Sequence, residues 1–231
     1  MNMSMANLKD FNMYYKKEGT GEPLILLHGN NEDSRIFDKT IKKLSKRYTV
    51  YALDSRGHGK SEGFVGAFSY ELMAEDVKEF MEIKKIKNAM VYGFSDGGII
   101  ALYLTLAYPS KVTKLMISGV NLFPKGLKRR YLMYFSFKEK FCKSKKEKAL
   151  YQLMLTQPNL TFEQLNAIKV PTLITVGKKD IVKLKHTLAI QKNISNSQLV
   201  LVKNANHYND ICHSSTIATI LYNFLTNQKQ S

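Results

Sequence analysis

A serine between glycines stands where an apolar segment of this chain gives way to a helical one. The hexapeptide Gly93-Phe94-Ser95-Asp96-Gly97-Gly98 follows the apolar run 89–92, which predicts a buried strand, and precedes residues 99–108, which predict a helix. A Gly-x-Ser-x-Gly sequence between a strand and a helix is the nucleophile-elbow pattern, whose tight turn requires small residues two before and two after the serine. Both positions are glycine. We therefore expect the turn to expose the Ser95 hydroxyl and to aim the first N–H groups of the next helix toward it.

A nucleophilic serine requires a general base, and the base requires an acid that orients it. Two loops further along the chain carry such residues. Residues 171–177 predict a buried strand that is followed by Asp180, and residues 198–202 predict another that is followed by His207. The sequence thus predicts Ser95, Asp180 and His207 as nucleophile, acid and base.

Each of these roles has a competitor. His213 is a second candidate base, but it directly precedes residues 214–223, which predict the last helix, and a base must lie on a loop that reaches the serine. The end of the predicted strand 114–118 is a second candidate place for the acid, but Gly119-Val120-Asn121 follows it without a carboxylate. Cys212 is a second candidate nucleophile, but no elbow flanks it.

Five landmarks fall in a recognisable order. They are the strand and His-Gly loop of residues 24–30, the Asp-x-Arg-Gly-x-Gly-x-Ser segment of residues 54–61, the elbow, the Gly-x-x-Asp of residues 177–180 and the late His207. In these landmarks and in the chain order Ser, Asp, His, the sequence resembles the α/β-hydrolase superfamily, specifically its small bacterial serine hydrolases. The resemblance covers nearly the whole chain, except that a short basic insert before Pro171 matches no subfamily of known substrate.

The resemblance implies one α/β-hydrolase domain over residues 1–231. Such a domain has a mostly parallel central sheet, helices on both faces and a short helical cap, inserted here at about residues 121–168. The predicted strands are short continuous apolar runs, as expected of a parallel sheet that is covered on both faces. The helix-like segments 33–47 and 69–85 alternate with these strands, as in βα units. A length of 231 residues and an apolar fraction of 44% suffice for a sizeable core.

The resemblance also implies a reaction. It is hydrolysis of an ester or related acyl bond of a small molecule through an acyl-enzyme, as in carboxylesterases, with no cofactor and no metal. The backbone N–H groups of Asn30 and Asp96 are then expected to form the oxyanion hole. The aromatic side chains expected to line the substrate pocket are Phe94, Tyr131, Tyr134 and Phe135. Some similar proteins keep the triad but act as ligand receptors or signalling partners with slow turnover, and this is the alternative function.

Four other polar residues are expected to have structural roles. His28 is expected to brace the oxyanion loop, and His58 to pack or hydrogen-bond within its own loop. Asp54 ends a strand on the other side of the elbow and is expected to be structural. His186 follows Asp180 in a predicted helix and is expected to be exposed.

The net charge of +16 is concentrated in the insert. Residues 125–148 contain ten basic and two acidic residues, which accounts for half of the net charge, and aromatic residues alternate with the basic ones. This pattern favours an amphipathic helical cap with a solvated lysine face. A second interpretation is attraction of an anionic substrate or an anionic membrane surface. Nucleic-acid binding is disfavoured because no recognition motif accompanies the charge.

The N-terminal residues, the apolar runs and the cysteines indicate where the protein acts. Residues 1–7 contain neither the basic nor the apolar region of a secretory signal, and no run approaches about 18 consecutive apolar residues. Cys142 and Cys212 have no metal-binding or redox spacing. We therefore expect a cytoplasmic enzyme with free thiols and no transmembrane segment.

Overall fold

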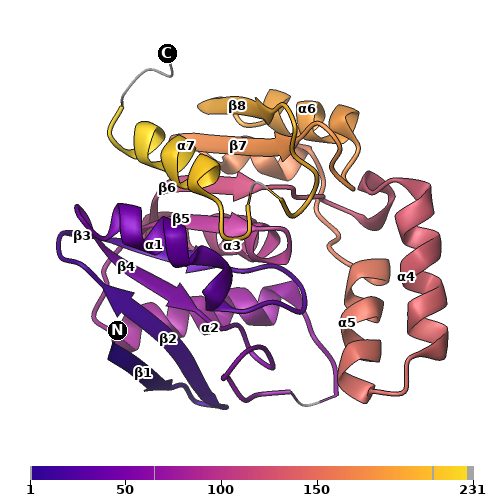
Figure 1. The fold of residues 1–231 in the computed structure, drawn as a ribbon, viewed down its shortest axis with the longest axis horizontal. Helices are drawn as coiled ribbons and strands as arrows, with labels where there is room; N and C mark the ends of the chain where they lie inside the picture. The colour runs from indigo at the N-terminus through magenta and orange to yellow at the C-terminus, as the bar shows by residue number, and fades with distance from the viewer. Residues whose placement is uncertain (1, 65, 210, 228–231) are drawn as a thin grey trace.

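An eight-stranded sheet forms the centre of the molecule (Figure 1). The computed structural model describes residues 2–64, 66–209 and 211–227. The strand order is β1-β2-β4-β3-β5-β6-β7-β8, with β3 to β8 parallel and β1 and β2 antiparallel at one edge. The strands are β1 (Asn2–Asn7), β2 (Asn12–Glu18), β3 (Glu22–Leu27), β4 (Tyr48–Leu53), β5 (Ala89–Phe94), β6 (Val112–Ser118), β7 (Thr172–Gly177) and β8 (Ser197–Val202).

The strands divide their apolar side chains between two cores. On β3, Leu24 and Leu26 belong to one core, whereas Ile25 and Leu27 belong to the other. Successive side chains of a strand point to opposite faces, so a strand that is buried on both faces must be apolar throughout. This explains why the strands are continuous apolar runs in the sequence.

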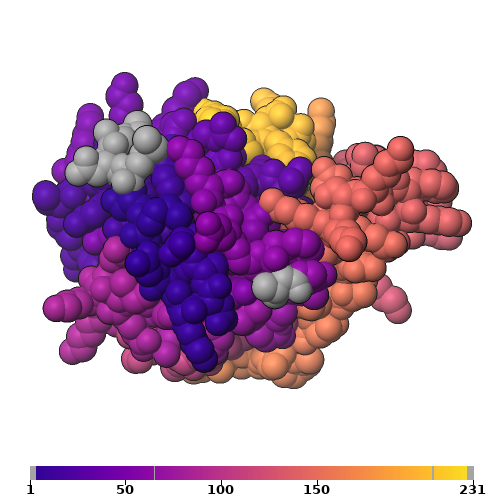
Figure 2. Space-filling view, turned by 90° about the horizontal axis from the view of Figure 1, so that it is seen from below, coloured from indigo at the N-terminus to yellow at the C-terminus, as the bar shows by residue number. Residues whose placement is uncertain are grey.

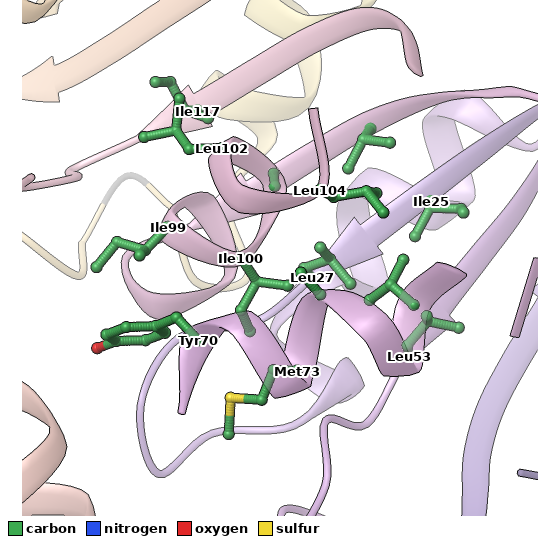
Figure 3. Packing of buried hydrophobic residues seen from close by; sticks show 14 of the residues in the cluster. Ile25, Leu27, Leu53, Tyr70, Met73, Ile99, Ile100, Leu102, Leu104 and Ile117 are labelled. Atoms are coloured by element: carbon green, nitrogen blue, oxygen red, sulfur yellow. The ribbon is translucent and has the colours of Figure 1, made fainter. Parts of the chain in front are cut away.

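Helices cover both faces of the sheet. The helices α1 (Asp38–Leu44) and α7 (Ser215–Leu225) pack together over one face, and α2 (Tyr70–Ile83), α3 (Asp96–Ala107) and α6 (Leu184–Lys192) cover the other. Figure 3 shows side chains of α2 and α3 packed against those of the sheet. The expected fold class, a mostly parallel sheet with helices on both faces, is confirmed.

Four elements differ from the sequence-based expectation. The helix predicted over residues 33–47 is a 3-10 turn, η1 (Ser34–Phe37), followed by the short α1. The helix predicted over residues 99–108 begins three residues earlier, at Asp96, because Ser95 is its N-cap. Strands β1 and β2 were not predicted, because both mix polar with apolar residues and lack a continuous apolar run.

Two further helices lie beside the sheet instead of on it. The helices α4 (Arg129–Phe141) and α5 (Lys145–Thr156) form an antiparallel pair between β6 and β7, which we call the cap hairpin (Figure 1). In Figure 2 this hairpin projects from one side of the molecule. Among the described residues, no helix combines the length and hydrophobicity needed to cross a bilayer.

Candidate active site

Ser95 occupies a sharp turn between β5 and α3. Its backbone has φ 52° and ψ −119°, a left-handed conformation that is strained for a residue with a side chain. The Ser95 N–H donates to the Ser118 carbonyl oxygen at 2.8 Å, which ties the turn to β6. A Cβ atom on Gly93 would lie 2.1 Å from the Gly97 carbonyl oxygen, and one on Gly97 would lie 2.1 Å from the Leu27 carbonyl oxygen. These two positions therefore admit only glycine, for the steric reason that the elbow pattern implies.

Ser95, His207 and Asp180 form a continuous hydrogen-bonded relay. The Ser95 hydroxyl lies 3.0 Å from His207 Nε2, and His207 Nδ1 lies 2.8 Å from Asp180 Oδ1. His207 and Asp180 are both almost fully buried. With the proton on Nδ1 donated to Asp180, Nε2 presents its lone pair to the serine hydroxyl, as a general base requires.

Local contacts keep Asp180 charged and in place. Burial alone would raise the pKa of this carboxyl, but the charge and hydrogen bond of His207 and the backbone amide of Val182 outweigh it and lower the pKa. Residues 126–128, at the base of the cap hairpin, pair with residues 181–183 like two short antiparallel strands. The Lys128 ammonium also donates to the Asp180 carbonyl oxygen. The loop that carries the acid is thus fastened to the base of the cap hairpin.

Gly119 provides the space in which the His207 ring lies. It has φ +61°, and a Cβ atom there would lie 2.9 Å from His207 Cε1 and 3.3 Å from Asp180 Oδ2. From the sequence, Gly119 was expected only to follow a strand without supplying a carboxylate. The glycine itself was the sequence feature that could have predicted this contact, because a backbone that another group approaches closely requires glycine.

Two backbone amides lie beside the serine. Asn30 follows β3, and Asp96 begins α3, where the first N–H groups of a helix have no intrahelical acceptor. The Asn30 side-chain amide donates to the Asp96 carboxylate at 2.9 Å, so the two segments are joined directly. Burial raises the pKa of Asp96, although hydrogen bonds from Asn30 and Tyr70 oppose this. Sequence analysis did not single out Tyr70, which is buried at the start of α2.

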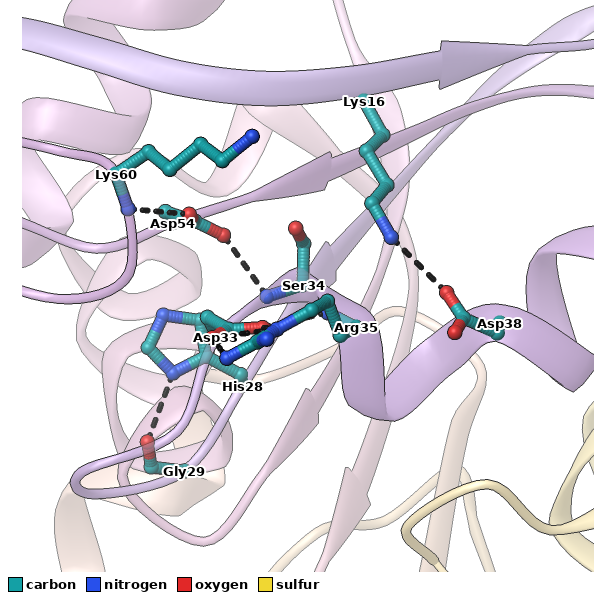
Figure 4. A network of polar contacts seen from close by, with 9 residues as sticks. All are labelled: Lys16, His28, Gly29, Asp33, Ser34, Arg35, Asp38, Asp54 and Lys60. Carbon is teal, nitrogen blue, oxygen red and sulfur yellow. Dashed lines mark hydrogen bonds and ion pairs between the residues drawn. The ribbon is translucent and has the colours of Figure 1, made fainter. Parts of the chain in front are cut away.

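Buried polar side chains support the loop that carries Asn30. His28 Nδ1 donates to the Gly29 carbonyl oxygen at 2.8 Å, and His28 Nε2 accepts from the Ser55 amide at 3.0 Å. Burial lowers the pKa of His28 to about 4, so the ring is neutral and can accept this bond at neutral pH. The Asp54 carboxylate accepts from the amides of Ser34 and Lys60 and so joins the loops after β3 and β4 (Figure 4).

Two cavities adjoin the Ser95 hydroxyl. The larger has a volume of about 290 Å³, and the smaller, of about 20 Å³, extends toward Tyr70. Three of the four aromatic residues predicted for the pocket line the larger cavity: Phe94, Tyr134 and Phe135. Tyr131 lines neither cavity, and its ring instead lies 4.9 Å from the Arg130 guanidinium.

Carboxyls, and no lysine or arginine, are the charged groups among the described residues that line these cavities. Glu32 and Asp96 line them together with His207. Burial raises the pKa of Glu32, whose carboxylate accepts from the Gly29 amide at 3.0 Å. The ten basic residues of 125–148 therefore lie outside the space beside Ser95. Glu32 was not predicted, because a single acid after a His-Gly loop carries no distinctive sequence pattern.

The positions of three other histidines can be compared with the expectations from the sequence. His186 was expected to be exposed, which is wrong: it is buried among Phe123 and Phe162, and its Nε2 accepts from the Leu122 amide at 3.0 Å. His58 does hydrogen-bond within its own loop, through Nδ1 and the carbonyl oxygen of residue 56. His213 is exposed, and His207 is the histidine that contacts Ser95.

The fold and this relay define an α/β protein with the architecture of a hydrolase. Residues 22–138 match the family described as having the alpha/beta hydrolase fold. The chain therefore belongs to the α/β-hydrolase family.

Individual relatives and structures agree with this assignment. The chain is 28% identical to the AB hydrolase superfamily protein YisY of Bacillus subtilis, over 84% of this chain and 88% of that protein. It is also 28% identical to human serine hydrolase BPHL, over 84% of this chain and 76% of that protein. Among solved structures, an enol-lactonase from Burkholderia xenovorans superposes with a TM-score of 0.81 at 18% identity, covering 96% of this chain and 100% of that one. At this identity the superposition shows the shared fold alone.

Proposed function

We propose that this chain is a serine hydrolase that cleaves an ester, or a related acyl bond, of a small molecule through an acyl-enzyme. The observation that carries the proposal is the relay in which Ser95 Oγ lies 3.0 Å from His207 Nε2 and His207 Nδ1 lies 2.8 Å from Asp180 Oδ1. The family membership and the serine hydrolase among the relatives support it.

Each group of the site has a role in this reaction. Ser95 Oγ attacks the acyl carbonyl carbon while His207 takes the hydroxyl proton. Asp180 keeps the imidazole in the correct tautomer and stabilises its charged form. The backbone N–H groups of Asn30 and Asp96 stabilise the negative charge that develops on the carbonyl oxygen. His207 then protonates the leaving group, and water cleaves the acyl-enzyme by the same route without a cofactor.

The cavity favours a small neutral substrate. Its volume of about 290 Å³ is at the lower end of the range for ligand pockets, and Phe94, Tyr134 and Phe135 give it an apolar wall. An anionic group there would face Glu32 and Asp96 without a cation to offset them. We therefore propose a carboxylesterase-like activity on neutral esters with short acyl groups, instead of the anionic substrate that the basic cap suggested.

A panel of neutral aryl esters graded by acyl length tests the proposal, together with a fluorophosphonate probe. We expect sustained turnover that is highest for short acyl groups, and labelling of Ser95. Ser95→Ala should abolish labelling and lower kcat/KM by at least about a thousandfold, because triad members act as a unit. Ser136→Ala, at an exposed serine of α4, is the matched control and should retain both the labelling by the probe and the turnover of esters.

Two results would contradict the proposal. One is labelling or undiminished turnover in Ser95→Ala. The other is release of a single acyl equivalent per chain without further turnover, which would favour the alternative of a hydrolase-like ligand receptor.

A further inference from the structure

The outward face of α4 carries large apolar side chains where a helix of a globular protein carries polar ones. Met133, Phe137 and Phe141 are spaced at i, i+4 and i+8, so they form one stripe along the helix. They are 63, 61 and 62% exposed, respectively, and α4 buries none of its side chains. Tyr134, on the same side, is also exposed. Contiguous exposed apolar surface of this kind marks an interaction site.

The inward face of the same helix has a different character. Phe135 and Glu139 are partly buried; Phe135 packs near Tyr151 of α5, and Glu139 accepts a hydrogen bond from Gln152 of α5. The acidic residue of α4 is therefore turned toward α5. The outward face carries apolar and basic side chains together with the small polar Ser136, and no acidic one.

Basic residues accompany the outward stripe. Within the helix they are Arg129, Arg130, Lys138 and Lys140, and the flanking segments add Lys125, Lys143, Lys145 and Lys148, all of them exposed. Met133, Phe137 and Phe141 also line an open groove of about 980 Å³ next to the side chains of Lys125, Arg129 and Lys140. Most lysines of the cap hairpin are exposed, as expected of a solvated face, and on α4 exposed aromatic residues accompany them.

We infer that the outward face of α4 docks the protein on an anionic membrane surface. A helix with an apolar stripe and basic flanks lies in the interface of a bilayer, with its apolar side chains among the acyl chains and its cations at the headgroups. The positive charge is diffuse, since the exposed basic residues are spread along α4 and the segments that flank it, and a surface of anionic headgroups matches such a pattern. The projection of the cap hairpin from the rest of the molecule lets this face approach a flat surface (Figure 2).

Docking in this orientation would place the active site near the lipid. Tyr134 belongs to the exposed side of α4 and also lines the cavity beside Ser95. The inference itself does not depend on the reaction at Ser95, and binding can be measured without a substrate.

Co-sedimentation with vesicles tests the inference. Vesicles of phosphatidylcholine alone are compared with vesicles in which about a third of the lipid is phosphatidylglycerol. We expect the protein to bind the anionic vesicles selectively and to be released when the salt concentration is raised to about 1 M, where the screening length falls to about 3 Å.

Two sets of variants separate the two contributions. Phe137→Ser with Phe141→Ser removes the apolar stripe, and Arg130→Gln with Lys138→Gln and Lys140→Gln removes three cations; each set should weaken binding about tenfold or more. The matched controls are Leu184→Ser with Leu188→Ser on the exposed side of α6, and Lys39→Gln with Lys42→Gln and Lys46→Gln near α1. These controls should bind as the unmodified chain does. Circular dichroism checks that each variant is folded.

Three results would overturn the inference. The first is absence of binding to anionic vesicles, and the second is equal binding to neutral and anionic vesicles. The third is a dimer in sedimentation velocity that Phe137→Ser with Phe141→Ser dissociates, because the stripe would then be an interface between copies of this chain.

Discussion

The side-chain amide of Asn30 donates a hydrogen bond to the carboxylate of Asp96, with 2.9 Å between Nδ2 and Oδ2. The bond joins the loop after β3 to the first residue of α3. These are the two residues whose backbone N–H groups we propose as oxyanion donors. The bond therefore fixes the spacing between the donors, and Tyr70 of α2 lies close enough to the same carboxyl to oppose the effect of burial on its pKa.

Loss of this bond should lower kcat more than it changes KM. Asn30→Ala and Asp96→Ala should each lower kcat about tenfold, because misplaced donors stabilise the developing oxyanion less well. The double variant should be little worse than either single one, since both remove the same interaction. Steady-state kinetics of the three variants on a neutral ester measure this coupling.

Asp96→Asn is the conservative control, because its amide keeps an oxygen that can accept from Asn30. It should retain most of the activity that Asp96→Ala loses. The bond would not position the donors if the losses of kcat in the two single variants multiplied in the double variant. The same conclusion would follow if the substitutions changed only KM.

The two histidines near the end of the chain should differ sharply. His207→Ala should lower kcat/KM at least about a thousandfold, whereas His213→Ala, at an exposed site, should change it by no more than about twofold. Asp180→Asn should keep the fold but lose about as much activity as His207→Ala, because the amide favours the wrong tautomer of the imidazole. An inactive His213→Ala variant would refute the assignment of the base.

The aromatic wall of the cavity should set the acyl-length preference. Phe135→Ala and Tyr134→Ala should shift the preference toward longer acyl groups, because each enlarges the cavity beside Ser95. Tyr131→Ala is the matched control on the same helix and should leave the preference unchanged, since Tyr131 does not line the cavity. Rates on a graded series of neutral esters measure the shift.

The same assay tests the charge of the preferred substrate. Neutral esters should react faster than anionic esters of equal size, and Arg129→Gln with Arg130→Gln should leave the rates on both nearly unchanged. A salt-dependent preference for anionic esters that this pair of substitutions removes would instead assign the cap charges to substrate attraction.

His186 should make stability depend on pH. Burial lowers its pKa from 6.5 to about 4, and the nearby Lys183 acts in the same direction. The unfolded chain therefore binds a proton at a higher pH than the folded one, so the free energy of unfolding is reduced as the pH falls from about 6.5 toward 4. His186→Gln keeps a group that can accept from the Leu122 amide but does not titrate.

Urea unfolding at pH 7 and pH 5 measures this contribution. Between these values the unmodified chain should lose about 2 kcal/mol more stability than His186→Gln does. Leu188→Gln, at an exposed position of the same helix, should keep the full pH dependence. An equal loss in all three proteins would mean that His186 does not titrate on unfolding.

The elements nearest the elbow were predictable because their rules are local. A Cβ atom on Gly93 would collide with Gly97 within the same turn, so this part of the elbow pattern is local. The requirement for glycine at 97 comes from Leu27 on the neighbouring strand β3, yet the spacing of the two glycines in the sequence was enough to predict the turn at Ser95. Strand β7 was predictable as well, since burial on both faces makes it a continuous apolar run. Strand β8 was predicted from its run of apolar residues, although it lies at the edge of the sheet and none of its residues is fully buried. Strands β1 and β2 were not predictable, because both mix polar with apolar residues.

The cap was predictable in composition but not in orientation. Its charges and aromatic residues were counted in the sequence, yet helical periodicity alone does not say which face of α4 meets α5. The structure turns Phe135 and Glu139 inward and Phe137 and Phe141 outward. The same ambiguity misled the prediction of His186, because a polar residue in a short helix is ordinarily exposed unless a distant segment, here residues 122–126, covers it.

The sequence by itself determined the fold family, the turn at Ser95 and the order of the three residues of the relay, because each depends on short-range sterics or on strand burial that a linear pattern records. Only the tertiary structure decided which partners meet across long separations. It brought His207 to Ser95, Asn30 and Tyr70 to Asp96, and Glu32 to the cavity. Contacts of this kind depend on the packing of the whole sheet and its helices, and no local pattern of residue types records them.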